Sequence, residues 1–362
     1  MISFLKHIWN SIVQPGKGKR VFVGVSGGVD SSVSALLLKL YGYEVTGVFI
    51  RTWQPDWIEC TWRDERRDAM RVCAYLQIPF VELDVEKEYK QGVADYMIKE
   101  YQLGRTPNPD VMCNREVKFG GFLNYALQNG ADFIATGHYA QTNQKDLMKG
   151  VDASKDQSYF LWTLNEKQLS KTLFPVGGFQ KSFTRLLARL YMIPVATKKD
   201  SQGICFIGEV DMKEFLGHYV PSKPGNVLNE SGEVIGTHQG VLLYTLGERH
   251  GFTIHKKTPD DEPYYVVKKD ILENTITVAH TVLQESDQAM ITLTDCVWRS
   301  EPDPGKTYSA QIRYHGTEYS CVLQKTDTQD YQITITTRES VSPGQSIVVF
   351  SGNYCIGGGV VR

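Results

Sequence analysis

The sequence predicts an α/β protein in which a parallel-sheet domain is followed by a small central domain and a C-terminal β-barrel-like domain. Three observations support this prediction. Apolar runs alternate with helix-like periodicity over roughly the first 140 residues, glycine and proline become more frequent after about residue 210, and brief β-type runs fill the region from about 290 onward. The chain of 362 residues is also too long for one ordinary hydrophobic core, and at about 150 residues per domain its length suggests two or three domains.

The first region is expected to alternate strands with helices. A short apolar run at 21–25 predicts a strand, and after a loop the apolar residues of 33–40 recur at helical spacing until Gly42. Further strands are predicted at 45–50, 80–85 and 133–136, and Ala69, Val72, Cys73 and Leu76 share one face of a second helix. Alternation of this kind favours a parallel sheet with helices on both faces.

The later regions are expected to be mostly β-structure. Short strands at 264–267 and 276–279 indicate a small linking domain. The runs at 289–293, 308–314, 320–325, 331–336 and 346–350 are separated by turns, which indicates a compact barrel or sandwich. The resulting division is an N-terminal extension at 1–19, a catalytic domain at 20–212, a central domain at 213–288 and a C-terminal domain at 289–362.

Composition is that of an ordinary soluble globular protein, with 41% hydrophobic and 22% charged residues. The formal net charge is −2, so the chain lacks the basic excess of many nucleic-acid-binding proteins. The first 20 residues carry four basic residues and no acid around an apolar stretch that is too short and too interrupted for a membrane span. We expect a short amphipathic arm and no membrane association.

The cysteines predict a reducing compartment. There are seven, an odd number without close pairs, in a chain that shows no signal peptide, so we expect a cytoplasmic protein and no disulfide framework. Cys-x-x-Cys spacing is absent from the sequence, which removes the usual indication of a zinc or thioredoxin-like site. Any sulfur chemistry must use cysteines that folding brings together.

The strongest local signal is the loop Gly24-Val-Ser-Gly-Gly-Val-Asp-Ser-Ser32, between the first strand and the first helix. Its glycines allow a tight turn and a close approach of the backbone, and its serines and the helix N-terminus supply hydrogen-bond donors, so it is expected to bind phosphate. Asp30 could hold magnesium. The pattern fits neither the Gly-x4-Gly-Lys phosphate loop nor the dinucleotide fingerprint. The alternative interpretation is a simple helix-capping turn.

A second block contains Asp110 and Cys113 within Gly104–Phe119. Its two prolines predict a stiff loop ahead of a helix that begins near Asn114. Cys113 would then lie beside a helix N-terminus and near basic residues, which favours the thiolate, and Asp110 could act as a general acid or base. The alternative for Cys113 is burial as a small hydrophobic residue.

A third block, Lys198–Gly208, places Cys205 after a polar, glycine-containing loop and between apolar residues. The alternative is a structural cysteine in a strand, because apolar neighbours usually mean burial. The other cysteines have no comparable context and are assigned to packing: Cys60, Cys73, Cys296, Cys321 and Cys355.

The loop resembles the Ser-Gly-Gly-x-Asp-Ser-Ser motif of the ATP-pyrophosphatase (adenine nucleotide alpha hydrolase-like) superfamily, whose members adenylate an oxygen and release pyrophosphate. This motif and five further blocks occur in the same order as in the bacterial tRNA-uridine 2-sulfurtransferase family, which the chain resembles over roughly residues 20 to 360. The further blocks are Asn108–Cys113, Ala135–Tyr139, Lys155–Leu161, Asp200–Gly208 and His238–Gly240.

The resemblance implies a role for each matching residue. ATP would be held by Gly24, Val25, Ser26, Gly27, Gly28, Val29, Asp30 and Ser31, by the backbone near Ile50 and by Gly137. Asn108, Pro109 and Asp110 would meet the target base of tRNA, and Lys155, Asp156, Gln157, Arg313 and Tyr314 would contact tRNA elsewhere. Family members usually have Met at the position of Ile50.

The implied reaction is ATP-dependent 2-thiolation of the wobble uridine in the anticodon loop of tRNA. Cys205 would carry a persulfide received from a sulfur-relay protein or a cysteine desulfurase, and Cys113 would release the sulfur by forming a disulfide with Cys205. Catalysis is thereby assigned to Cys113, Cys205 and Asp110, with ATP and magnesium as cofactors.

Three other interpretations stay open. The chain could be another ATP-pyrophosphatase, a ligase or amidotransferase, which would leave both cysteines without a role. Asp110, Cys113 and Cys205 could instead hold an iron–sulfur cluster that carries the sulfur, although the persulfide is favoured. The chain could also be a non-catalytic RNA-binding relative with a degenerate nucleotide pocket. His138 has no second ligand at metal-binding spacing and is expected to line the pocket or to be structural.

Overall fold

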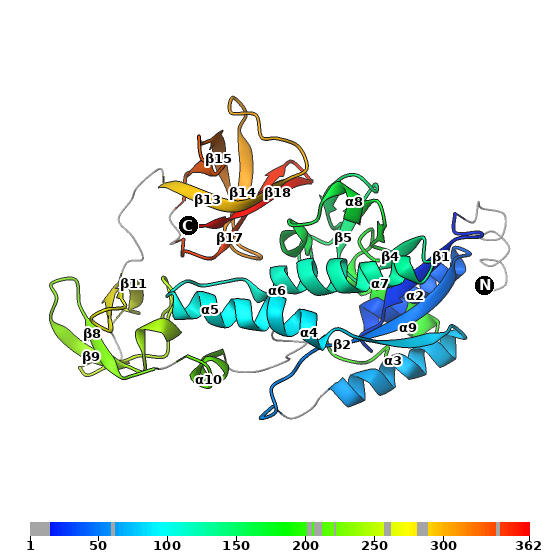
Figure 1. Ribbon diagram of the computed structural model, residues 1–362, viewed down its shortest axis with the longest axis horizontal. Helices are drawn as coiled ribbons and strands as arrows, with labels where there is room; N and C mark the ends of the chain where they lie inside the picture. Colours follow the sequence, from blue (N-terminus) through cyan, green and yellow to red (C-terminus); the bar gives the residue numbers. More distant parts are fainter. Residues whose placement is uncertain are drawn as a thin grey trace. The chain divides into compact units, whose positions relative to one another are not determined.

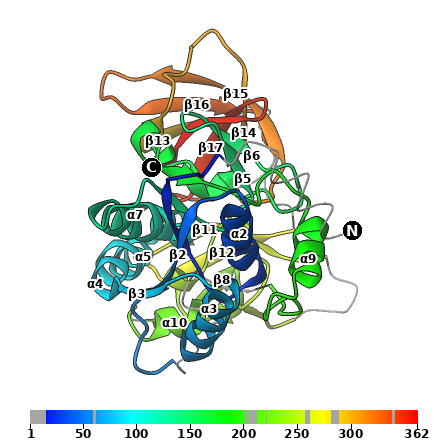
Figure 2. The ribbon, with the colours of Figure 1, turned by 90° about the vertical axis from the view of Figure 1, so that its right-hand side faces the viewer.

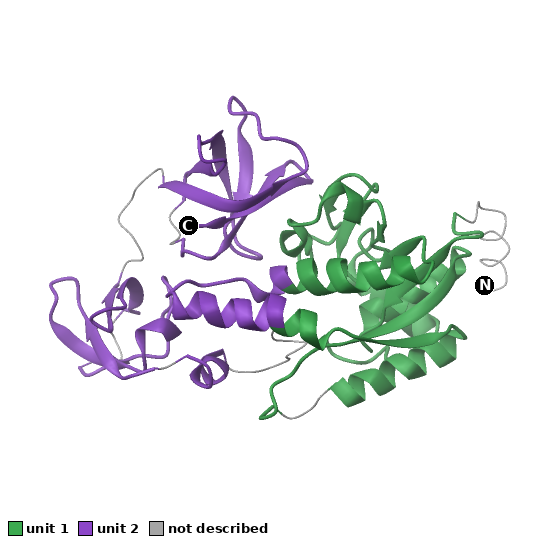
Figure 3. Cartoon of the chain, in the orientation of Figure 1, with its two compact units in different colours: residues 1–90, 113–208 green, residues 91–112, 209–362 purple. Residues whose placement is uncertain are grey.

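The computed structural model describes residues 15–58, 62–200, 205, 212–220, 222–256, 262–280, 289–337 and 341–362. The chain divides into two compact units (Figure 3). Unit 1 comprises residues 1–90 and 113–208, and unit 2 comprises residues 91–112 and 209–362. The predicted domain boundaries at 213 and 289 stay predictions, because both fall within unit 2.

Unit 1 is built on a five-stranded parallel sheet in the order β3-β2-β1-β4-β7. Its strands β1, β2 and β4 are labelled in Figure 1. Every strand predicted from the alternating apolar runs is present, with ends shifted by one or two residues. The strands are β1 (Arg20–Gly24), β2 (Glu44–Arg51), β3 (Phe80–Asp84), β4 (Phe133–Ala135) and β7 (Thr172–Leu173).

Helices cover both faces of this sheet, as predicted (Figure 2). On one face α2, α3 and α9 share a core with inward-pointing strand residues such as Val21 and Val23. On the other face Phe22 packs near Tyr125 of α7, with ring centroids 6.3 Å apart. The helices of unit 1 are α2 (Val29–Leu40), α3 (Trp62–Leu76), α4 (Glu86–Tyr89), the π-helix η2 (Cys113–Gly121), α7 (Phe122–Gln128), the 3-10 helix η3 (Ser158–Leu161), α8 (Glu166–Leu169) and α9 (Lys181–Leu190).

The sequence pattern explains the local boundaries of these helices. In α3 the buried residues are the four predicted to share one face, Ala69, Val72, Cys73 and Leu76. The first helix, α2, ends before Gly42, whose φ of 84° lies in the left-handed region that glycine tolerates. A short hairpin, β5 (Ala140–Thr142) and β6 (Leu147–Lys149), follows the fourth strand.

The first part of unit 2 contains a second five-stranded sheet, in the order β10-β9-β8-β12-β11. It is antiparallel except for the β8–β12 pair. Its strands are β8 (Gly225–Leu228), β9 (Val234–His238), β10 (Thr253–Ile254), β11 (Tyr265–Asp270) and β12 (Thr275–Ala279), and its short helices are α10 (Met212–Gly217) and the 3-10 helix η4 (Val241–Leu243). The two strands predicted here, at 264–267 and 276–279, are confirmed as β11 and β12.

The second part of unit 2 is a closed six-stranded β-barrel, because β13 pairs with both β16 and β18. The barrel predicted from the brief apolar runs is therefore confirmed. Its strands are β13 (Ala289–Trp298), β14 (Tyr308–Gln311), β15 (Glu318–Lys325), β16 (Tyr331–Ile335), β17 (Ser346–Ser351) and β18 (Tyr354–Val361). The last strand was not predicted, because its three consecutive glycines at 357–359 resemble a loop.

An earlier segment of the chain completes unit 2. It contains the π-helix η1 (Lys90–Asp95), which begins at the last residue of unit 1, together with α5 (Tyr96–Gln102) and α6 (Pro109–Met112). The amide of Thr106 donates to the carbonyl of Pro343 at 2.8 Å, and Lys269 Nζ donates to the carbonyl of Gly104 at 3.1 Å. These contacts join residues 91–112 to both later parts of the unit.

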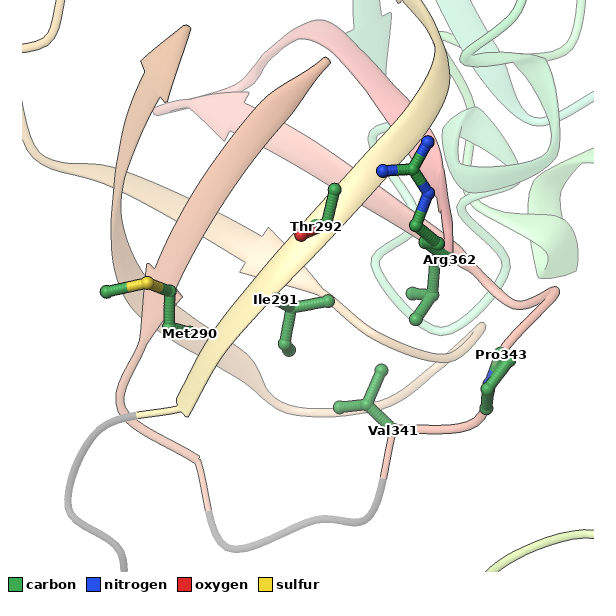
Figure 4. A pocket seen from close by; sticks show the side chains of 7 residues that line it. Met290, Ile291, Thr292, Val341, Pro343 and Arg362 are labelled. Carbon is green, nitrogen blue, oxygen red and sulfur yellow. The ribbon is translucent and has the colours of Figure 1, made fainter. Parts of the chain in front are cut away.

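A pocket of about 290 Å³ lies on the barrel (Figure 4). None of the residues predicted to be functional lines it. The lining residues are Met290, Ile291, Thr292, Val341, Pro343, Val361 and Arg362. In the described part of the chain, no helix has both the length and the apolar character that a membrane crossing requires.

Candidate active site

The topology of the parallel sheet marks one place for a ligand. The chain runs from β1 outward to β2 and β3 on one side, and it later enters β4 on the other side of β1. The loops that follow β1 and β4 therefore leave the sheet edge in opposite directions, which opens a crevice at the carboxyl ends of these strands. The motif at 24–32 follows β1, and Gly137 follows β4, so two predicted nucleotide-binding segments meet there.

The backbone of the first loop depends on its glycines. Gly27 has a φ of 73°, and a Cβ at this position would lie 2.5 Å from the carbonyl oxygen of Glu65 in α3. Gly28 is the N-cap of α2 and has no side chain with which to cap it. The first amides of a twelve-residue helix are thus left for an external acceptor, and the helix dipole favours an anion.

The serines of the loop partly stabilise the loop itself. Ser32 Oγ donates to the carbonyl of Gly28 at 2.7 Å, and Ser31 Oγ accepts from the amide of Ser26 at 3.2 Å. Gly137 lies directly against this helix start, since a Cβ there would be 2.7 Å from the amide nitrogen of Ser31. Ile50, the remaining predicted nucleotide-binding residue, is buried next to the end of β2.

Asp30, in the first turn of α2, is held by two side chains from other segments. Lys181 Nζ lies 2.7 Å from Oδ2 and 2.9 Å from Oδ1, and the hydroxyl of Tyr139 donates to Oδ1 at 2.9 Å. Burial and then the charge of Asp30 raise the pKa of Tyr139, so its hydroxyl remains a donor. The loop after β4 and the start of α9 are thereby tied to the phosphate loop.

Asp200 receives cations from two segments, α9 and the loop that carries Lys155. Lys181 Nζ lies 2.8 Å and Arg185 Nη2 2.5 Å from its Oδ1, while Lys155 Nζ lies 3.6 Å from its Oδ2. Burial by itself would raise the pKa of Asp200, but hydrogen bonds and charge from Lys181 and Arg185 prevail and lower it. The carboxylate is therefore ionised at neutral pH.

Asp30 as placed does not fit a magnesium ligand, because both of its oxygens face the ammonium of Lys181. Within the described residues, no group of three or more His, Cys, Asp and Glu side chains could hold a metal ion. The neighbours of Cys205 at 201–204 and 206–211 lie outside those residues.

The structure corrects the predicted start of the helix around Cys113. The helix begins at Pro109, where proline is tolerated because the first helical amide needs no partner. Asn108 Oδ1 accepts from the amide of Val111 at 3.2 Å, as an N-cap does. Cys113 is buried at the start of η2, a turn beyond the helix N-terminus, so the expected effect of the helix start on its thiol loses its basis.

Cys205 is half-buried, and its carbonyl accepts a hydrogen bond of 2.9 Å from the hydroxyl of Tyr89 at the end of α4. The short helix α4 packs against η2, whose first residue is Cys113. Cys205 therefore lies beside a helix that contacts the Cys113 helix. Asp110 falls in unit 2, because the division runs between Met112 and Cys113.

The predicted tRNA-binding residues differ in their surroundings. Asp156 Oδ1 accepts from the amide of Gly150 at 2.8 Å, and Gln157 Oε1 accepts from the amide of Tyr139 at 3.0 Å, so both support local structure. Lys155 is 44% exposed. In unit 2, Arg313 Nη2 donates to the carbonyl of Leu246 at 3.5 Å, and the ring of Tyr314 meets that of its exposed neighbour His315 edge to face, with centroids 4.0 Å apart.

Other cysteines are in environments that suppress reactivity. Burial raises the pKa of Cys73 to about 11 and the pKa values of Cys296 and Cys321 to about 12, so these thiols stay protonated. Cys355 is also buried. Their assignment to packing agrees with these surroundings, whereas Cys60 lies outside the described residues.

His138 is structural in this fold. It is buried between the rings of Phe119 and Phe174, with centroids 6.0 and 6.1 Å away, and its Nδ1 lies 2.8 Å from Thr136 Oγ1. Burial and then the charge of Lys118 hold the pKa of His138 well below its usual value. The ring is therefore neutral at physiological pH.

Lys181 and Arg185 were missed by the sequence analysis, although they organise the site. They lie four positions apart in α9 and hence on one face of that helix. This i, i+4 pair of cations was the available signal. It is a weak one, because such pairs usually face solvent.

Comparison with known proteins gives three family models that cover nearly the whole chain. Residues 19–209 match a "tRNA methyl transferase HUP domain", residues 213–280 a "tRNA methyl transferase PRC-barrel domain" and residues 288–361 an "Aminomethyltransferase beta-barrel domain". Among solved structures, the chain is similar to "U34-tRNA thiolase NcsA from Methanococcus maripaludis with its [4Fe-4S] cluster" at 18% identity, over 60% of this chain and 70% of that one. The TM-score is 0.37, which is too low to carry an argument.

Full-length relatives are much more similar. The "tRNA-specific 2-thiouridylase MnmA" of Nitrosomonas europaea is 45% identical over 94% of this chain and 98% of that protein. The protein of the same name from Bacillus subtilis is 43% identical over 94% of each.

Proposed function

The chain belongs to the family of tRNA-specific 2-thiouridylases, and on that premise we propose that it uses ATP to replace the 2-oxygen of the tRNA wobble uridine with sulfur. The observation that carries the ATP-dependent part is the phosphate loop at the β1–β4 switch point. There the uncapped start of α2, the glycines and the Lys181 ammonium converge. The activity is that of a tRNA-uridine 2-sulfurtransferase.

The first step that we propose is adenylation. The 2-oxygen of uridine attacks the α-phosphorus of ATP, the bond from that phosphorus to the bridging oxygen breaks, and its electron pair leaves with pyrophosphate. An oxygen bound to AMP is a much better leaving group than a carbonyl oxygen. The residues assigned to ATP are those of 24–31 together with Ile50 and Gly137. Magnesium stays a proposed cofactor to which no step is assigned, and Asp30 would hold it only once the Lys181 ammonium has left its carboxylate.

The second step is sulfur transfer through two cysteines. The terminal sulfur of a persulfide on Cys205 attacks the activated carbon, and AMP departs with its oxygen. The Cys113 thiolate then attacks the Cys205 sulfur, the sulfur–sulfur bond to the base breaks, and a Cys113–Cys205 disulfide forms. Two electrons from an external thiol must restore both cysteines. The packing of α4 against η2, with Tyr89 bonded to Cys205, supports this pairing.

We assign the base-binding role to Asn108, Pro109 and Asp110, with Asp110 as the general acid or base. The cap at Asn108 and the rigid ring of Pro109 fix the backbone on which Asp110 is carried. A single-stranded anticodon loop reduces the cost of extruding the base. Contacts elsewhere on tRNA are assigned to Lys155, Asp156, Gln157, Arg313 and Tyr314. The sulfur of the Cys205 persulfide would come from a cytoplasmic sulfur-relay protein or cysteine desulfurase.

Persulfide mapping tests the assignment. The full-length protein is incubated with a cysteine desulfurase and cysteine, digested without reductant and analysed by mass spectrometry. We expect an adduct of about 32 Da, the mass of one sulfur atom, on the Cys205 peptide. ATP and tRNA should remove it and link Cys113 to Cys205. Loading on Cys113 alone, or turnover without the crosslink, contradicts the two roles.

The same preparation separates the rival functions. Pyrophosphate release that requires tRNA, together with thiolated uridine in the digested tRNA, supports the proposal. ATP cleavage that requires a small amine acceptor indicates a ligase or amidotransferase, and tRNA binding without ATP cleavage indicates a non-catalytic relative. Stoichiometric iron and sulfide after anaerobic purification indicate a cluster in place of the persulfide.

A further inference from the structure

Three cations surround Asp200, and one of them also binds Asp30. Lys181 bridges the two carboxylates, with Nζ 2.7 Å from Asp30 Oδ2 and 2.8 Å from Asp200 Oδ1. Arg185, one turn further along α9, lies 2.5 Å from Asp200, and Lys155 approaches it from another segment at 3.6 Å. Three cations against two carboxylates leave a surplus of one positive charge in this cluster.

The cluster lies where the phosphates of a nucleotide are expected. Asp30 is in the first turn of α2, whose first amides await an acceptor, so the ammonium bonded to Asp30 is at the same helix end. The Lys181 side chain is only 11% exposed. A charge that is largely withdrawn from water interacts more strongly with an anion than a charge on the surface does.

We propose that Asp30 and Asp200 hold Lys181 and Arg185 only while the site lacks a nucleotide, and that the phosphates of ATP take both cations from these carboxylates. Lys181 and Arg185 then bind the pyrophosphate that leaves during adenylation. This inference rests on the proposed function, and it adds two catalytic residues and one positioning residue, Asp200.

The exchange follows from the charges of the competing anions. A largely buried ammonium without a partner is costly, so the carboxylates stabilise the empty site. Each carboxylate carries one negative charge, whereas the polyphosphate carries several and also meets the amides of α2. The lowered pKa of Asp200 agrees with an ionised partner that competes for the same cations.

Competition predicts that the two ends of one ion pair act in opposite directions. Removing the Lys181 charge should weaken pyrophosphate binding, and removing the Asp200 charge should strengthen it. A purely structural ion pair predicts that both changes weaken binding, because either one disturbs the fold of the site.

The test is calorimetric titration of the full-length protein with inorganic pyrophosphate at constant ionic strength. We expect Lys181→Met to raise Kd at least about tenfold, Lys181→Arg to restore part of the affinity, and Asp200→Asn to lower Kd about threefold to tenfold. Rapid-quench measurement of adenylation should show Lys181→Met slowed by about 10²- to 10³-fold.

Asp84→Asn is the matched control for Asp200→Asn. Asp84 ends β3 at the same edge of the sheet, and its partner Arg51 keeps Glu86 at 2.9 Å. The same change of charge there should alter Kd less than about twofold. Adenosine, which has no phosphate, should bind every variant as it binds the parent protein.

The outcomes separate this inference from the function on which it rests. Unchanged or weaker pyrophosphate binding in folded Asp200→Asn overturns the exchange, even if ATP still binds at the loop. If that variant does not fold, Arg185→Met provides the test: it should weaken pyrophosphate binding several-fold without affecting adenosine, and unchanged binding overturns the proposal. Failure of the parent protein to bind ATP rejects the proposed function itself.

Discussion

The carboxyl edge of the parallel sheet and the interior of the C-terminal barrel treat ionisable groups in opposite ways. At the sheet edge, Asp200 stays charged because cations from distant segments surround it and lower its pKa. In the barrel, Cys296 and Cys321 stay uncharged because burial raises their pKa values to about 12. The first environment prepares groups for reaction, and the second prevents it. The surroundings of an ionisable group therefore decide its role, and the number of cysteines says little about chemistry.

The largest expected effect contrasts cysteines from the two regions. Cys205→Ser should lower the thiolation rate at least about 10³-fold, because a hydroxyl carries no persulfide, and Cys321→Ser should change it less than about twofold. Quantification of thiouridine by mass spectrometry measures both. Comparable losses in the two variants would remove the contrast between the regions.

Cys113→Ser provides a finer test of the same contrast. Serine cannot cleave the sulfur–sulfur bond by forming a disulfide, so Cys205 should still accept sulfur, AMP should still leave, and tRNA should accumulate joined to Cys205 through the transferred sulfur. Sustained thiouridine production by this variant would reject the two-cysteine scheme.

A smaller effect is expected from crowding the crevice beside β4. Gly137→Ala places a Cβ 2.7 Å from the amide nitrogen of Ser31, so the start of α2 must move and ATP should bind about tenfold more weakly. Gly178→Ala is the control, since nothing lies within 4 Å of a Cβ there. Equilibrium binding of ATP checks both variants. Equal affinities would show that the contact between the two loops does not shape the nucleotide site.

Much of the fold could be predicted from the sequence, because the strands of unit 1 are short apolar runs and the helices between them bury one face. The prediction failed where local composition conceals the structure. The strand β18 contains consecutive glycines that pair within the closed barrel, for example Gly358 with Val348. The helix at Cys113 was predicted to start too late, because Pro109 was taken to forbid a helix although it begins one.

The site was only partly predictable for a different reason. The motif at 24–32 is local, so its glycines and serines indicated a phosphate loop without knowledge of the fold. Lys181 lies 151 positions after Asp30, and their contact exists only because α9 packs beside α2. Nothing in the residues around Lys181 specifies that partner. The magnesium role predicted for Asp30 did not take account of Lys181 for the same reason. The residues around Asp30 gave no sign that an ammonium binds its carboxylate.

The smallest expected effect concerns the pH dependence of barrel stability. Burial raises the pKa of Cys321 from 9.0 to about 12, so between these values the folded chain keeps a proton that the unfolded chain has lost. Because the native state binds more protons, the contribution of Cys321 to the free energy of unfolding is fully present below about pH 9 and falls as pH rises, by at most about 1.4 kcal/mol per pH unit.

Cys321→Ala removes this titration, so the stability of that variant should fall less steeply between about pH 9 and 10.5 than that of the parent protein. Urea unfolding at several pH values measures both slopes, and other groups that titrate in this range cancel in the difference. Val322→Ala, a change at the neighbouring exposed residue, should retain the parent slope. Parallel pH profiles for the Cys321→Ala variant and the parent protein would show that the barrel does not suppress ionisation of this thiol, and the contrast with the sheet edge would then rest on Cys296 alone.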